Sequence, residues 1–82
     1  MQIGRRIYYD NASGEVILDK GEMEGDVLQT TDMQDIFSFP VLSERDRDSF
    51  DYINLEFGAF SDQFKEHKSY KVNVKSKQII FS

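Results

Sequence analysis

The residue types that most often carry catalysis or bind a metal are scarce in this sequence. It has no cysteine and a single histidine, His67. The absence of cysteine excludes a thiolate nucleophile, a thiolate-bound metal and a disulfide. His67 follows Lys65 and Glu66 at the end of an expected helix, where an imidazole faces the negative end of the helix dipole. We therefore expect His67 to be a surface residue rather than a general base or a metal ligand.

The run Asp46-Arg47-Asp48-Ser49-Phe50-Asp51 resembles a calcium-binding loop because acidic residues alternate in it. A calcium loop of the EF-hand type also needs a central glycine and a bidentate glutamate at its twelfth position. No glycine follows these acids, and Phe50 begins an alternating pattern that is typical of a strand. Local ion pairs between the alternating arginines and aspartates explain the run better, so we expect no bound metal.

The glycines and serines form neither a nucleotide-binding motif nor a nucleophile motif. The five glycines are spread along the chain as turn residues at positions 4, 14, 21, 25 and 58, whereas a phosphate-binding loop needs them clustered before a helix. No serine lies in a nucleophile-elbow sequence. Carboxylates are plentiful, but a chain of 82 residues offers no deep cleft around a catalytic pair. We therefore expect a protein without catalytic residues, cofactor or enzyme activity.

Aromatic residues are the most suggestive feature for binding. Four tyrosines and seven phenylalanines make up 13% of the chain. Tyr8 and Tyr9 are neighbours in an expected strand and point to opposite faces, so we expect one of them to lie outside the core. Exposed tyrosines suit protein contacts because they offer a large contact area at low entropic cost. Tyr8, Tyr9 and Tyr52 are therefore candidate partner-binding residues; the alternative is that all the aromatic rings pack internally.

Acidic residues are concentrated in the body of the chain and lysines near its end. The net charge is −5, with acidic groups at Glu22, Glu24 and Asp26 and again between positions 46 and 51. From position 65 onward five lysines accompany a single glutamate. An acidic body repels nucleic acid, so we expect no direct nucleic-acid binding. Glu22, Glu24 and Asp26 form a second candidate partner-binding patch; the alternative is ordinary solvated surface.

Alternating apolar residues predict the first part of a sheet. Residues 5–10 and 15–19 form a hairpin around a loop in which Gly14 tolerates a positive φ. The polar residues 21–26 are bracketed by glycines and predict a mobile loop. Residues 27–30 could form a third strand.

A second set of strands is predicted in the other half of the chain. Residues 50–57 alternate strictly, with Ile53, Leu55 and Phe57 on one face, and form the clearest strand in the sequence. Residues 70–74 and 79–81 alternate again, with a turn at Lys75-Ser76-Lys77, and predict a terminal hairpin.

Two helical segments are predicted between these strands, and the first of them contains two short helices. Thr31 and Gln34 fit a capping box that starts a short helix. The apolar residues that share one face of this helix are Met33, Ile36 and Phe37. The helix should end near Phe39, because Pro40 disfavours helical backbone for the residue before it. Pro40 can itself start a second helix that runs to about Arg47.

The other helical segment covers residues 59–68, where Phe60 and Phe64 have the i, i+4 spacing of an amphipathic helix. The elements together predict an α+β fold, a small antiparallel β-meander of about five to six short strands with two short helical segments packed on one side. The length of the chain supports one core, so residues 1–82 are expected to form a single domain.

The start of the chain contains no targeting pattern. Arg5-Arg6 is not followed by the apolar stretch of a signal peptide, and no segment is long and apolar enough to span a membrane. We therefore expect the protein to act inside the cell, without a membrane partner.

The chain begins with MQIGRRIYYD at residues 1–10, and SGEVIL follows at residues 13–18. These residues resemble the start of a group of small phage and prophage proteins from viruses of Gram-positive bacteria. The group has roughly MQIGKRIYYD-x-x-TG-x-VI, then a glycine-containing loop and TT-x-x-QD. The residues that stand in the loop and in the second motif are Gly25, Thr30, Thr31, Gln34 and Asp35. Those that match the later strand motifs of the group are Ile53, Leu55, Phe57, Gly58, Tyr70 and Val72.

These motifs are turns, a helix cap and strand cores, so the resemblance implies no catalytic residue. Members of the group are known by their genes' position near tail and lysis genes rather than by an activity. The resemblance implies a non-enzymatic phage protein that acts by protein–protein binding, with a small virion or tail-associated component as the first hypothesis. The alternative is a phage-encoded inhibitor or acidic decoy of a host or defence protein. The protein would then be found in the host-cell cytoplasm or, under the first hypothesis, in the virion.

Overall fold

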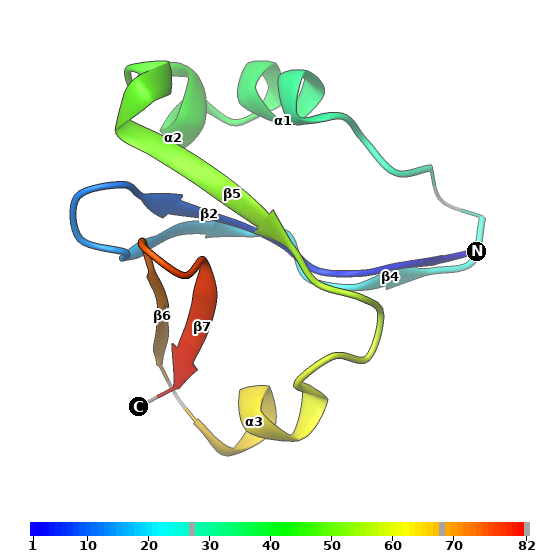
Figure 1. Cartoon of the computed structure of the whole chain (residues 1–82). Helices are drawn as coiled ribbons and strands as arrows, with labels where there is room; N and C mark the ends of the chain where they lie inside the picture. The colour runs from blue at the N-terminus through cyan, green and yellow to red at the C-terminus, as the bar shows by residue number, and fades with distance from the viewer. Residues whose placement is uncertain (27, 68, 82) are drawn as a thin grey trace.

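The computed structural model of this chain describes residues 1–26, 28–67 and 69–81. Its centre is an antiparallel sheet with strand order β3–β2–β5, formed by Val16–Asp19, Arg6–Asp10 and Phe50–Asn54 (Figure 1). Short helices and a second hairpin cover this sheet, so the predicted α+β fold of short antiparallel strands is confirmed. The radius of gyration is 12.8 Å, close to the roughly 12 Å of a compact chain of this length.

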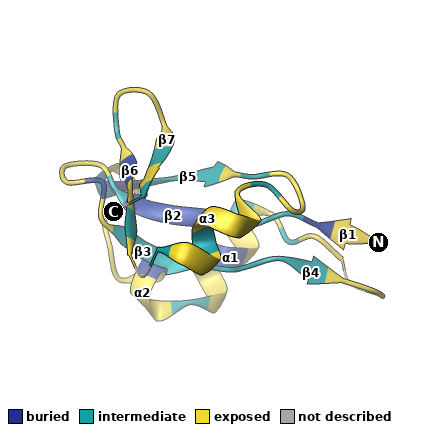
Figure 2. Cartoon of the chain, turned by 90° about the horizontal axis from the view of Figure 1, so that it is seen from below, coloured by how far each residue is buried: buried dark blue, intermediate teal, exposed yellow. Residues whose placement is uncertain are grey.

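The middle strand β2 is buried on both of its faces (Figure 2). Side chains alternate along a strand, so Ile7 and Tyr9 point to one face of the sheet and Tyr8 to the other. These three residues are at most 1% exposed. The expectation that Tyr8 or Tyr9 lies outside the core is therefore wrong, because each face of the sheet has its own apolar layer.

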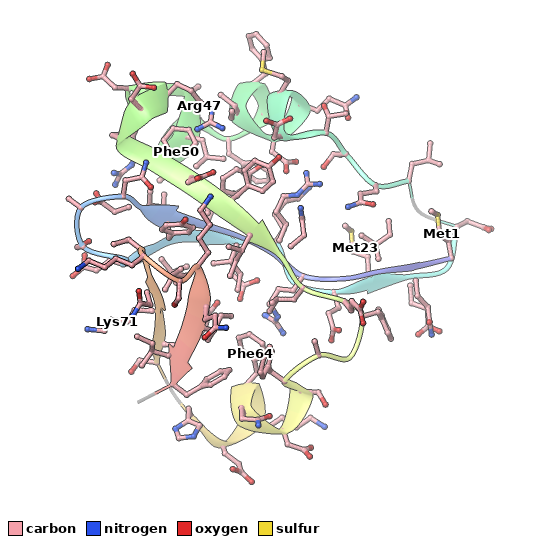
Figure 3. The ribbon with its side chains drawn as sticks, in the orientation of Figure 1. Met1, Met23, Arg47, Phe50, Phe64 and Lys71 are labelled. Carbon is pink, nitrogen blue, oxygen red and sulfur yellow. The ribbon has the colours of Figure 1, made fainter. Side chains whose placement is uncertain are left out.

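The helices α1 (Asp32–Ser38) and α2 (Pro40–Ser43) cover the face to which Tyr8 points. Tyr8, Leu42 and Phe50 are the buried residues of this layer. The Tyr8 ring lies 6.2 Å from the ring of Phe50 and 5.4 Å from that of Tyr52. Phe50 lies directly beneath the helices (Figure 3).

The opposite face is covered by α3 (Ser61–Glu66) and by the hairpin of β6 (Tyr70–Asn73) and β7 (Gln78–Phe81). Here Ile7, Tyr9 and Val72 are buried, and Phe64 of α3 packs against them. The Phe64 ring also meets Phe81 edge to face at 5.1 Å. This layer confirms the predicted terminal hairpin and the short helix before it.

The helical segments thus lie on both faces of the central sheet rather than on one side (Figure 1). The reason is the composition of β2. Because its apolar side chains point in both directions, each face must be covered to remove them from water.

The start of α1 follows its predicted capping box. The Thr31 hydroxyl accepts a hydrogen bond from the Gln34 amide, and the Gln34 side chain accepts one from the Thr31 amide. Pro40 stands at the first position of α2, as predicted. The second helix ends at Ser43, earlier than expected, and a 3₁₀ turn at Arg47–Ser49 leads into β5.

The predicted loop at residues 21–26 contains a strand instead. Met23–Glu24 form β4, which pairs with β1 at Gln2–Ile3. The pairing joins residues 20 and 22 positions apart, so local pattern does not reveal it. The third strand predicted at 27–30 is not present at residues 28–30, and position 27 lies outside the described residues.

The strand predicted at 50–57 is real but shorter. β5 ends at Asn54, although the Leu55 amide still donates to the Arg5 carbonyl at 2.7 Å. Ile53 and Leu55 pack as expected, against the layer that contains Ile7 and Tyr9. Phe57 is instead 38% exposed.

Candidate functional site

The most highly connected polar group of the described residues is Asp35, which is 1% exposed. Its Oδ2 accepts hydrogen bonds from the Tyr8 hydroxyl at 2.7 Å and from Arg6 Nη1 at 2.9 Å. Its Oδ1 accepts from Lys20 Nζ and from Thr30 Oγ1, both at 2.6 Å. We call these residues (Arg6, Tyr8, Lys20, Thr30 and Asp35) the Asp35 cluster.

The Asp35 cluster is assembled from segments that are distant in sequence. Arg6 and Tyr8 come from β2, Lys20 follows β3, and Thr30 precedes the capped start of α1. Arg6 Nη1 also donates to the Thr30 carbonyl at 2.8 Å. The cluster therefore attaches α1 to the sheet through charge-assisted hydrogen bonds.

The protonation states in this cluster follow from its contacts. Burial alone would raise the pKa of Asp35, but the hydrogen bonds from its neighbours outweigh burial and hold the pKa at about 2. Burial raises the pKa of Tyr8, and the hydrogen bond to the Asp35 carboxylate raises it further. At neutral pH the pair is therefore a carboxylate and a neutral phenol.

This arrangement gives the Asp35 cluster a structural role. Both carboxylate oxygens are occupied by donors, so no lone pair is presented to a substrate. The cavity beside Arg6, Lys20 and Thr30 measures about 10 Å³, which is at the lower limit for one water molecule. A general acid or base must reach the reacting atoms, and Asp35 cannot.

A second, similar cluster lies at the other face of the sheet. Asp19 Oδ2 accepts from Arg5 Nη1 at 2.6 Å and from the Tyr70 hydroxyl. The Arg5 guanidinium lies over the Phe64 ring, 3.9 Å from its centroid. Burial raises the pKa of Tyr70, and its bond to Asp19 adds to the shift. The neighbours Arg5 and Arg6 thus each bind an aspartate that also accepts from a tyrosine.

His67 and the acidic residues form no metal-binding group among the described residues. His67 caps the end of α3, is half-buried and stacks on Phe81 with 5.5 Å between the ring centroids. No group of three or more histidine, aspartate or glutamate side chains that could hold a metal occurs in residues 1–26, 28–67 and 69–81.

Two of the three predicted tyrosine contact residues are not at the surface. Tyr8 and Tyr9 are fully buried, so neither is available to a partner, and proposing them as binding residues was wrong. Tyr52 is half-buried, with its ring against Tyr8 and the Arg6 guanidinium 5.4 Å from its centroid. Tyr8 and Tyr9 are buried because β2 is the middle strand of a sheet with two covered faces. Its successive side chains therefore enter opposite apolar layers.

The predicted acidic patch lies on and beside β4. Glu22 is half-buried and accepts a hydrogen bond from the Gly58 amide, whereas Glu24 and Asp26 are exposed. Glu24 also accepts from the Gln2 side chain at 3.4 Å. Their role in partner binding stays a prediction.

An apolar surface that the sequence reasoning did not identify lies on the outer side of α1 and α2. Met33 is 56%, Phe37 79% and Val41 42% exposed. We call these three residues the helical surface. Met33 and Phe37 are one turn apart on α1, and Val41 lies on α2 after the extended Phe39, whereas Ile36 and Leu42 face the sheet. The prediction that Met33, Ile36 and Phe37 share one face of the helix is therefore wrong, because Ile36 packs toward the sheet while Met33 and Phe37 are exposed.

Comparison of this chain with protein-family models, with curated proteins and with solved structures found no match. Within the described part of the chain, no helix is long and apolar enough to cross a membrane.

Proposed function

We propose that this chain is a non-enzymatic phage protein that acts by binding another protein, and that the helical surface is its contact. The observation that carries the proposal is the 79% exposure of Phe37 beside two further exposed apolar side chains. Single exposed apolar residues are common, whereas apolar groups gathered on one face mark protein contacts. Aromatic and methionine side chains are also enriched at interfaces.

The state of the two aspartates in the polar clusters supports a binding role over catalysis. The carboxylates of Asp35 and Asp19 are already occupied by arginine and tyrosine donors. Their function is to hold the layers together, which leaves the surface as the functional part of the molecule.

The resemblance of residues 1–18 and of the later motifs to phage and prophage proteins supports a place for the protein in the virion or tail. The partner is then a phage structural protein. The second candidate is an inhibitor of a host or defence protein, and the exposed carboxylates of Glu24 and Asp26 favour it because an acidic surface can occupy a basic groove.

Mass spectrometry of purified virions tests the first candidate. A phage that lacks the gene is complemented with the wild-type protein or with Phe37→Ser, and the copies per virion are counted. We expect the wild type to be incorporated and Phe37→Ser to be reduced at least about tenfold, the equivalent of losing one buried aromatic contact. The control is Leu28→Ser, which removes an apolar residue that is 87% exposed and outside the helical surface.

Absence of the wild-type protein from virions would overturn the virion role. Co-purification with a host protein early in infection, and its release at high salt, would instead support the inhibitor, because exposed charge pairs are screened. Equal incorporation of Phe37→Ser and wild type would show that the helical surface is not the contact.

A further inference from the structure

A second exposed surface lies on the outer side of the β6–β7 hairpin. A hollow of about 360 Å³ is lined there by Lys71, Val72, Val74, Lys75 and Ile80, together with Ser13 of the first hairpin loop. Ile80 is 40% exposed. Lys71 extends outward from the margin of the hairpin (Figure 3). We call Lys71, Lys75 and Ile80 the hairpin surface.

The hairpin surface and the helical surface are complementary in charge. Residues 69–81 contain three lysines and no carboxylate, whereas residues 31–48 contain five acidic residues and two arginines. One of those acids, Asp35, is buried, but Glu44, Asp46 and Asp48 are exposed beside α2. The helical surface therefore combines three exposed apolar side chains with neighbouring acidic residues, whereas the hairpin surface combines one exposed apolar side chain, Ile80, with two lysines.

We infer that the helical surface of one copy of this chain docks into the hairpin surface of a second copy. The inference rests on the proposed function in so far as it takes the helical surface to be a protein contact. Phe37 is the most exposed apolar side chain of the helical surface, and the hollow beside Ile80 offers an apolar floor for it. The lysine stems can cover the ring while their ammonium groups face the acids of the partner.

The position of the two surfaces determines the form of the assembly. α1 and α2 cover one face of the central sheet and the hairpin covers the other (Figure 1). A copy that docks through one surface therefore leaves its other surface free for a further copy. Contacts between different surfaces that do not close on themselves produce open, head-to-tail chains.

Sedimentation of the purified wild-type protein as a function of concentration and salt is the first test. We expect association that grows with concentration and weakens several-fold as salt rises from about 0.01 to 1 M, because the screening length falls from roughly 30 to 3 Å. A protein that stays monomeric at low salt up to about 1 mM would overturn the inference.

Mixing two complementary variants tests the head-to-tail arrangement. Phe37→Ser disables the helical surface, and Lys71→Glu/Lys75→Glu disables the hairpin surface. Each variant alone should be monomeric, while an equal mixture should form a heterodimer and nothing larger, because only one intact pair of surfaces remains. A mixture that stays monomeric would contradict the arrangement.

The controls separate this inference from effects on folding and from the proposed function. Lys65→Glu reverses an exposed lysine outside the hairpin surface and should leave association unchanged; equal loss would overturn the inference. If the double variant does not fold, Ile80→Thr replaces it, since a β-branched residue keeps the strand.

A monomeric wild type, together with loss of virion incorporation in Phe37→Ser, would refute self-association alone. Normal incorporation of Phe37→Ser, together with loss of its self-association, would refute the proposed virion contact alone.

Discussion

Arg5 and Arg6 show how adjacent residues can hold two layers of a small protein. Because neighbouring side chains of a strand point in opposite directions, Arg5 reaches Asp19 at one face and Arg6 reaches Asp35 at the other. Each aspartate also accepts a hydrogen bond from a tyrosine hydroxyl. The carboxylate of Asp35 is buried and that of Asp19 half-buried, and in both clusters protein donors replace the lost water.

Tyr8→Phe tests the Asp35 cluster at the scale of one atom. The substitution keeps the ring packing and removes the hydroxyl that donates to Asp35 at 2.7 Å. A hydrogen bond to a buried charged group contributes about 1.5–3 kcal/mol, so we expect the free energy of unfolding in urea to fall by that amount. The matched control is Tyr52→Phe, which leaves the hydrogen bonds to Asp35 intact and should change stability by less than about 0.5 kcal/mol. Equal effects of the two substitutions would refute the role given to the Tyr8 hydroxyl.

At the scale of the element, the α1–α2 segment contains two competing apolar stripes. Ile36, Phe39 and Leu42 pack toward the sheet, whereas Met33, Phe37 and Val41 point outward. Ile36 lies three positions after Met33 and one before Phe37, so the periodicity of α1 does not separate its buried side from its exposed side. Asp35 decides it here, because its hydrogen bonds to β2 and to Lys20 orient α1 toward the sheet.

Two glycines test the contact between the first hairpin loop and β6. Gly14 and Gly21 both have a positive φ, of 79° and 67°. A Cβ at Gly14 would lie 2.0 Å from the Val72 carbonyl oxygen, whereas one at Gly21 would meet nothing within 4 Å.

We expect Gly21→Ala to cost only the left-handed strain of about 1–2 kcal/mol. Gly14→Ala should cost roughly 3 kcal/mol or more, because the loop must also move away from β6 and break the 2.8 Å bond from the Val72 amide to the Gly14 carbonyl. Thermal or urea unfolding of both variants measures the difference. Similar losses in the two would mean that the close approach at Gly14 does not matter for stability.

At the scale of the whole molecule, both faces of the central sheet are covered by helices or by the β6–β7 hairpin. The molecule measures 32 × 31 × 20 Å, and the core layers are each only one side chain deep on either side of β2. Stability therefore depends on the polar clusters as well as on apolar packing, because a chain this small buries little apolar surface.

The stability of the whole protein at acidic pH should reveal the contribution of the Asp35 cluster. The pKa of Asp35 is about 2 in the folded protein, below its ordinary value of 3.8. A lowered pKa stabilises the folded state above the unfolded pKa, and this contribution is lost as pH falls from about 5 toward 2. For Asp35 it amounts to roughly 2 kcal/mol.

The measurement is the free energy of unfolding between pH 7 and pH 2. Other carboxylates also contribute to its slope, so Tyr8→Phe serves as the reference. That variant lacks one of the hydrogen bonds that lower the pKa of Asp35, and its stability should fall less over the same range. Identical pH profiles would contradict the coupling of Tyr8 to Asp35.

Much of the local structure could be predicted from particular residues. The capping box of Thr31 and Gln34, the helix start at Pro40 and the alternation of Tyr70 and Val72 depend on neighbours within a few positions. These interactions are local, so the sequence by itself determines the element types and the α+β class. The existence of the short strands β1 and β4 and their pairing were not predictable, because they depend on residues about 20 positions apart.

The candidate site was decided by the tertiary structure. Adjacent tyrosines in β2 indicated that one ring would be exposed, but layers on both faces bury them both. Likewise, Met33 and Phe37 matched the pattern of a buried helix face, and became the exposed surface because Asp35 directs the other side of α1 to the sheet. A sequence determines which side chains share a face; which face is covered depends on what the rest of the chain packs against it.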